Sequence, residues 1–116
     1  MNNGTRACIA FIAGRIISSK IASHIYDYLK SRYINISGSV TNKNVNIYDY
    51  DRGCYFSGSI PSLFDYGTSS YVELKINGNK FSGFDYNDGH YFSGSVNGNS
   101  ITLYDYGESK HFSFSI

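Results

Sequence analysis

Residues 45–60 read VNIYDYDRGCYFSGSI, and the same 16-residue unit returns as PSLFDYGTSSYVELKI (61–76), FSGFDYNDGHYFSGSV (81–96) and ITLYDYGESKHFSFSI (101–116). Each unit carries an aromatic-Asp-Tyr triplet at its fourth to sixth positions. Self-similarity at a short spacing means that one supersecondary unit is used repeatedly. The repeat therefore decides the fold, although it names no reaction.

Each unit is typical of a β-hairpin. Apolar and polar residues alternate with a period of two, and short turns such as DRGC, NDGH and NGNK separate the runs. Together with YINISGSV at 33–40, the units predict roughly nine strands. Connections this short force antiparallel neighbours, so we expect residues 33–116 to form a curved antiparallel meander of hairpin repeats.

The strand register follows if each inner turn is a four-residue loop, with Tyr50 facing Tyr55 in the first unit. Between units, the register places Phe56 opposite Asp65 and Val72 opposite Asp85. The triplet aspartates then share one face with the apolar residues, because side chains alternate between faces. There they accept hydrogen bonds from turn amides or pair with a basic residue on a helix. The opposite face carries a tyrosine ladder, and its seven members are the candidate binding residues: Tyr50, Tyr55, Tyr66, Tyr71, Tyr86, Tyr91 and Tyr106.

Residues 5–31 lack strand signals and have apolar residues in steps of four, at Ile17, Ile21, Ile25 and Leu29. This spacing predicts one long helix. Because an eight-stranded barrel has room only for side chains or a small ligand, we expect an open sheet with the helix packed on one face. We expect the helix to cross at the glycines of the core face, Gly38, Gly58, Gly83 and Gly94. The fold class is mostly β (α+β), with residues 1–116 as one domain.

A second apolar stripe, formed by Ile9, Ile12 and Ile16, lies on the opposite side of the predicted helix. Nine strands span about 38 Å, and one helix of about 10–12 Å cannot cover them. A second copy of the chain would cover the remainder. The sequence therefore predicts a homodimer with this stripe as an oligomer contact.

Composition excludes several classes of function. The net charge is +1, and no run of Lys or Arg occurs, which argues against nucleic acid and membrane surfaces as partners. Arg15 and Lys20 interrupt the apolar run near the N-terminus, so it is too short and too charged for a secretory or membrane-spanning segment. We expect a soluble, cytoplasmic protein, with secretion left open.

The chain has two cysteines, Cys8 and Cys54, at no metal-binding spacing. We expect both to be free thiols, and a disulfide between them is the alternative.

No catalytic motif is present. The chain lacks G-x-S-x-G, P-loop and dinucleotide patterns, and His24, His90 and His111 have no Cys or Ser partner at a motif spacing. The acidic and amide residues at 85–88 match neither EF-hand nor zinc spacing. We therefore expect no enzyme activity, no catalytic residues, no metal and no cofactor.

Two hypotheses of function remain. The first is a non-enzymatic structural or interaction module that associates with itself. The alternative is a binding module for a glycan or a protein, because tyrosines flanked by Ser and Asn suit sugar rings and protein interfaces. YFSGSVNG at 91–98 resembles the Y-x-x-G-x-x-N-G pattern of MORN repeats. The repeat period differs from that of the MORN family, and we assign no family.

Overall fold

The computed structural model describes residues 1–116 and contains one helix followed by ten strands. The helix is α1 (Asn3–Ser18). The strands are β1 (His24–Asp27), β2 (Arg32–Val40), β3 (Asn44–Asp49), β4 (Cys54–Ser59), β5 (Ser62–Asp65), β6 (Ser70–Asn77), β7 (Lys80–Asp85), β8 (His90–Asn97), β9 (Ser100–Asp105) and β10 (Lys110–Ser115).

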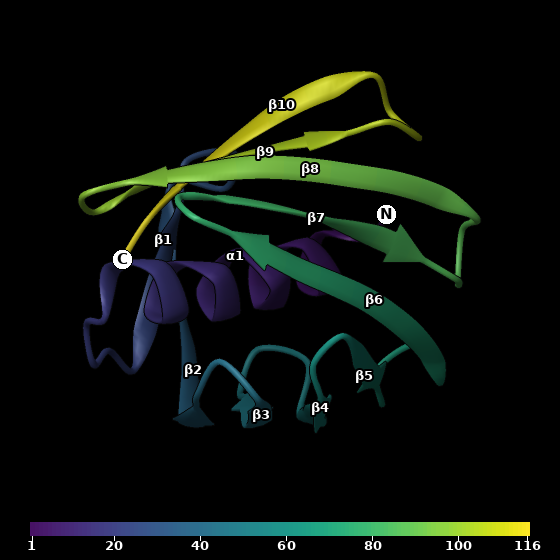
Figure 1. Ribbon diagram of the computed structural model, residues 1–116, viewed down its shortest axis with the longest axis horizontal. Coiled ribbons are helices and arrows are strands. Elements are labelled where there is room, and N and C mark those ends of the chain that lie inside the picture. The colour runs from purple at the N-terminus through teal and green to yellow at the C-terminus, as the bar shows by residue number, and fades with distance from the viewer.

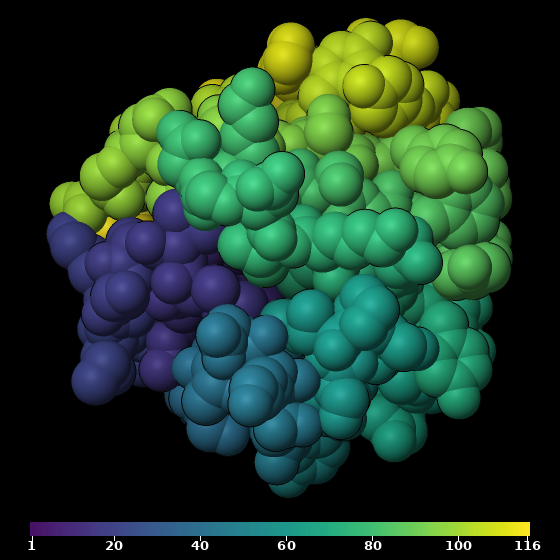
Figure 2. All heavy atoms as spheres, viewed as in Figure 1, coloured from purple at the N-terminus to yellow at the C-terminus, as the bar shows by residue number.

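Every strand pairs antiparallel with the next strand of the chain, and β1 also pairs with β10, which closes the sheet into a barrel. The closing register places Tyr26 opposite Ser115 and Asp27 opposite Phe114. Figure 1 shows the N-terminus near the ends of the strands that carry the triplet turns, and the C-terminus at the other end. In the space-filling view the strands follow one another around the molecule in chain order (Figure 2).

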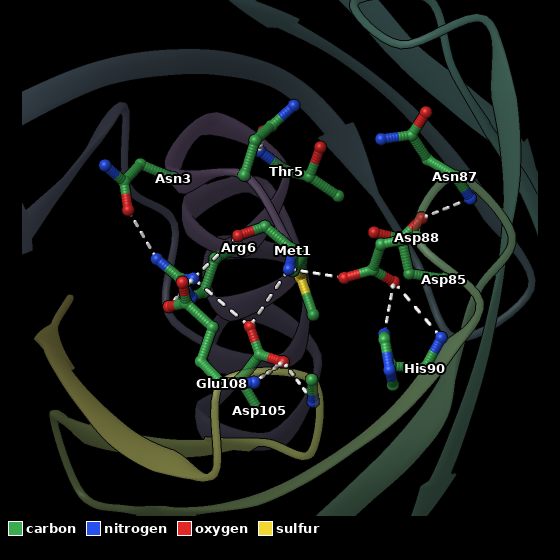
Figure 3. Close-up of polar contacts among 12 residues, drawn as sticks. Met1, Asn3, Thr5, Arg6, Asp85, Asn87, Asp88, His90, Asp105 and Glu108 are labelled. Carbon is green, nitrogen blue, oxygen red and sulfur yellow. Dashed lines mark hydrogen bonds and ion pairs between the residues drawn. The ribbon is translucent and has the colours of Figure 1, made fainter.

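The helix fills the barrel. Ten consecutive residues of α1, Thr5 to Gly14, are buried, and the close-up along the helix shows the strands on all sides of it (Figure 3). A helix that is buried around its whole circumference must be apolar or paired on every side. Small residues such as Ala7, Ala10 and Gly14 keep it thin, and a Cβ on Gly14 would come within 2.8 Å of Ile101 Cδ1.

The structure confirms a mostly β chain with one N-terminal helix packed against an antiparallel meander. The roughly nine strands expected are ten, and the sheet is closed around the helix instead of lying open beneath it. A ten-stranded barrel is wider than the eight-stranded one used in the prediction, because barrel diameter grows with strand number.

The helix is shorter than predicted. The expected helix over 5–31 ends at Ser18, where Ser19 adopts a left-handed conformation with φ of 59°. The residues that continued its apolar spacing belong elsewhere: Ile25 lies in β1, and Ile21 is 93% exposed. Tyr26, Asp27 and Tyr28 form a fifth copy of the triplet, so pairing of β1 with β2 and β10 overrides the local helical pattern.

The register between units is confirmed, with Phe56 opposite Asp65 and Val72 opposite Asp85. Within a unit the observed pairing differs from the predicted one by two residues. Tyr48 faces Tyr55, whereas the predicted partner, Tyr50, lies in the turn. A shift of two leaves every side chain on its predicted face.

Two of the core-face glycines, Gly83 and Gly94, pack against phenylalanine rings. Phe81 lies opposite Gly94 on β8, and Phe92 lies opposite Gly83 on β7. A Cβ on Gly83 would lie 2.6 Å from the Phe92 ring and 1.7 Å from the Glu73 carbonyl oxygen. At Gly83 and Gly94, aromatic rings and carbonyl oxygens of neighbouring strands lie nearest to the glycine.

The predicted oligomer contact is also wrong in its main residues. Ile9 and Ile12 have no exposed surface and belong to the core inside the barrel, while Ile16 packs against that core in part. The apolar stripe that motivated a homodimer is thus covered by the strands of the same chain.

Candidate binding surface

The triplet aspartates hold the five turns. In each hairpin Oδ1 of the aspartate accepts a hydrogen bond from the backbone N–H two residues later, at 2.9–3.0 Å. The donor amides belong to Leu29, Asp51, Gly67, Asn87 and Gly107. This confirms the prediction that these aspartates accept turn amides.

In Asp49, Asp65 and Asp105 the second carboxylate oxygen contacts residues of α1 near its start, where the helix dipole favours negative charge. Thr5 Oγ1 donates to Asp65 Oδ2 at 2.5 Å, and Arg6 Nη2 donates to Asp105 Oδ2 at 3.1 Å. Arg52 bridges two hairpins by donating to Asp49 at 2.7 Å and to Asp65 at 3.1 Å. The cluster therefore fastens the helix to the barrel wall.

The pKa values of two aspartates in this cluster are shifted in opposite directions. Burial acts to raise the pKa of Asp105, but the Arg6 hydrogen bond and the N-terminal ammonium outweigh it and hold the pKa below its ordinary value. Asp85 lacks such a cation on its Oδ2, which is buried without a hydrogen-bond partner, and burial raises its pKa. Figure 3 shows both side chains around the N-terminal amine, which pairs with Asp88 and Asp105.

The interior offers no reactive thiol. Cys8 is fully buried on α1, with its Sγ 3.5 Å from Arg52 Nη2, and burial raises its pKa well above the ordinary value. Cys8 and Cys54 are both free. No group of three or more His, Cys, Asp or Glu side chains is arranged to hold a metal ion.

The outer wall near the triplet turns carries one aromatic triad on each hairpin. A central ring makes edge-to-face contacts with a ring two residues later and with a ring on the next strand, at centroid separations of 4.6–4.9 Å. The central rings, half-buried, are Tyr26, Tyr48, Phe64, Phe84 and Tyr104. Edge-to-face pairs of this kind stabilise by about 0.5–1.5 kcal/mol each.

The flanking rings form what we call the tyrosine belt. All seven predicted tyrosines belong to it, and each is between 54% and 65% exposed. Tyr28 and Tyr33, which sequence reasoning missed because they fell in or beside the predicted helix, complete it at 57% and 60%. The signal was present in the spacing, since Tyr33 follows Asp27 by six residues as Tyr55 follows Asp49.

Two surface hollows lie between neighbouring hairpins of the belt. At each junction a tyrosine N–H donates to a tyrosine carbonyl at 3.1 Å, from Tyr86 to Tyr71 and from Tyr106 to Tyr91. The two rings of a junction contact the central rings of different hairpins, as Tyr71 does with Phe64 and Tyr86 with Phe84. The hollows have volumes of about 510 Å³ at Tyr71 and Tyr86 and about 460 Å³ at Tyr91 and Tyr106.

The hollow at Tyr91 and Tyr106 continues along the outer wall into a third hollow of about 430 Å³. The two share Lys75, Ser82 and Ser93. We call the combined surface the trough; the residues that matter below are Lys75, Lys80, Ser82, Ser93, Tyr104 and His111.

Comparisons with protein-family models, with curated proteins and with solved structures find no match. No helix of the chain combines the length and the apolar character needed to cross a membrane.

Proposed function

We propose that the protein is a non-enzymatic interaction module that binds its partner through the tyrosine belt. The observation that carries the proposal is the exposure of nine tyrosines, each more than half exposed, in one repeated arrangement on a closed wall. Tyrosine supplies a large amphipathic contact area at a small cost in conformational entropy. Such a surface suits recognition.

The filled interior directs binding to the outside. Barrels that hold a small ligand keep a central cavity for it. Here α1 occupies the centre and joins a single core of 23 buried residues. The hollows between the exposed aromatic rings are concave and lie open to a ligand on the outer wall.

The closed sheet also limits how a partner engages the wall. Strand addition requires a free sheet edge, and pairing of β1 with β10 removes both edges. A partner must therefore contact side chains, and the belt offers aromatic rings beside hydroxyls of Ser62, Ser69 and Ser70. This combination favours a glycan, which presents apolar ring faces and many hydroxyl groups.

The aromatic triads also stabilise their hairpins, and this role explains the half-buried central rings. It does not require the flanking rings to be tyrosine, because a phenylalanine makes the same edge-to-face contact. The phenolic oxygens add hydrogen-bonding groups on the solvent side. We assign the flanking tyrosines to binding. The central rings stabilise the scaffold, and among them Tyr104 also lines the trough.

The experiment monitors tyrosine ring resonances by NMR while neutral and acidic oligosaccharides are added to about 10 mM, which detects even millimolar affinity. We expect one saccharide class to move belt resonances, and Tyr71→Ser with Tyr86→Ser to weaken that binding if the ligand occupies their hollow. A second series dilutes the protein alone and tests self-association through the same rings. Ring resonances that move in neither series would refute the proposal.

A further inference from the structure

We infer that the trough on the outer wall of β6–β10 binds an acidic oligosaccharide, with lysines holding the anionic groups and aromatic rings stacking on the sugar. The inference rests on the proposed function and names the ligand class and the position of the site on the belt. Three features of the trough carry it: its cations, its floor and its aromatic wall.

The cations lie on one side. Lys75 on β6 is opposite Ser82, and Lys80 on β7 is opposite Ser95, so the two ammonium groups stand on adjacent strands. Glu73 is the one carboxylate that lines the trough, and it lies 3.9 Å from Lys75. Lys80 has no carboxylate beside it in the trough, which leaves it free to pair with an anionic ligand.

The floor is made of short hydroxyl side chains. Ser82 and Ser93 face each other across β7 and β8, and Ser95 faces Thr102 across β8 and β9. Each hydroxyl both donates and accepts, which matches the hydroxyl groups of a sugar.

The wall opposite the lysines is aromatic. Tyr104 contacts His111 edge-to-face at 4.6 Å, and both line the trough. Two strand spacings, about 9.5 Å, separate the strand of Lys80 from that of Tyr104. A short oligosaccharide therefore reaches both sides at once, with one sugar against the rings and a carboxylate at the ammonium groups.

Comparison with the other repeats separates the lysine of the trough from the repeated scaffold. The row across the trough runs Lys75, Ser82, Ser93, Tyr104, His111 through successive strand pairs. The equivalent row one hairpin earlier runs Ser59, Ser62, Glu73, Phe84, Tyr91. The aromatic positions persist, while a serine replaces the lysine and a glutamate replaces Ser93. A further row runs Ser39, Asn46, Ser57, Phe64, Tyr71 and has a serine at the position of Ser93. The lysine is thus particular to the trough, and the glutamate is particular to the neighbouring row.

The test measures binding of trigalacturonate, its methyl ester and maltotriose by NMR and calorimetry. The ester keeps the rings and removes the charge, so we expect trigalacturonate to bind at least ten times more tightly than the ester. Amide shifts should concentrate on β6–β10. Equal binding of acid and ester, or shifts elsewhere on the barrel, would overturn the inference.

Variants separate charge in the trough from charge in general. We expect Lys75→Ser with Lys80→Ser to weaken trigalacturonate binding at least tenfold, while Lys30→Ser with Lys43→Ser, which changes the net charge equally on other hairpins, has less than a twofold effect. Ser93→Glu reproduces the glutamate of the earlier row and should abolish binding. All these side chains lie at the surface, so an unchanged thermal midpoint shows that each variant folds.

Three outcomes keep this inference distinct from the proposed function. If maltotriose or the ester binds as well as the acid and moves belt tyrosines, the acidic ligand is wrong and the belt remains the binding surface. If oligothymidylate binds the trough more tightly than trigalacturonate, the ligand class is wrong. If no saccharide binds, the inference fails, and the dilution series still decides whether the belt binds a second copy.

Discussion

Arg6, in the first turn of the buried helix, donates a hydrogen bond from Nη2 to Oδ2 of Asp105 at 3.1 Å, although 99 residues separate the two along the chain. Arg6 is 2% exposed, and its guanidinium carbon lies 3.5 Å from the centroid of the Phe112 ring. The contact fixes the beginning of the helix to the last hairpin. It therefore links the two ends of the sequence inside the barrel.

Replacing Arg6 with Met should destabilise the protein strongly. The variant leaves the Asp105 carboxylate buried without its guanidinium partner, which costs about 3–5 kcal/mol. Urea unfolding measures the change. Arg6→Met combined with Asp105→Asn should recover much of the loss, because asparagine removes the charge and keeps the oxygen that accepts from Gly107. A single variant as stable as the natural protein would contradict this role.

The two aspartates near the N-terminal amine should give opposite pH dependences. Asp105 has a lowered pKa, so its contribution is present above the ordinary value of 3.8 and is lost as pH falls through the folded-state pKa. Asp85 has a raised pKa, so its charged form destabilises the fold as pH rises from 3.8 through its folded-state pKa.

Unfolding free energies measured against pH for Asp85→Asn and Asp105→Asn check these signs. Relative to the natural protein, the stability of Asp85→Asn should rise as pH increases from 3.8 through the folded-state pKa of Asp85. The relative stability of Asp105→Asn should fall as pH increases from the folded-state pKa of Asp105 to 3.8. Curves of the same sign for both variants would show that the two environments do not differ as described.

Gly83→Ala should destabilise the barrel far more than a glycine substitution in a turn. The new methyl group would lie 1.7 Å from the Glu73 carbonyl oxygen and 2.6 Å from the Phe92 ring, so the backbone itself must move. We expect a loss of about 3 kcal/mol, at the upper end of overpacking effects. Gly78→Ala is the control: nothing lies within 4 Å, and only its φ of +62° carries a cost, about 1 kcal/mol. Equal losses at the two sites would contradict the packing described for β7.

Ile12→Ala distinguishes a core position from an oligomer contact. Because Ile12 is fully buried, truncation should cost about 2–5 kcal/mol of unfolding free energy. Ile21→Ala, at a position that is 93% exposed, should change it by less than about 0.5 kcal/mol. Light scattering supplies the second readout. A change in molecular mass for Ile12→Ala without loss of stability would restore the oligomer-contact prediction.

Much of the sheet could be predicted because the triplet relates the position of each turn to the end of the strand before it. An aspartate that caps a turn must stand at the end of a strand, and this places its flanking aromatic residues on the outer face. The seven belt tyrosines and the pairing of Phe56 with Asp65 followed from that constraint.

The closure of the barrel could not be predicted from the same pattern. The fifth triplet at 26–28 was hidden because Ile21, Ile25 and Leu29 imitate the spacing of a helix. Only pairing with β2 and β10 decides that this segment is a strand. The trough was missed for a related reason. Lys75 and His111 line one surface only because five successive strands, β6 to β10, pair in this register.

The most direct test of the account is a tyrosine-ring NMR titration of the natural protein with trigalacturonate, repeated with Ser93→Glu. Binding of an acidic oligosaccharide in the trough predicts that the resonances of Tyr91, Tyr104 and Tyr106 move on titration, that tyrosines of the first two hairpins stay fixed, and that Ser93→Glu abolishes the response. Ring resonances that stay fixed throughout, or a response that survives Ser93→Glu unchanged, would contradict it.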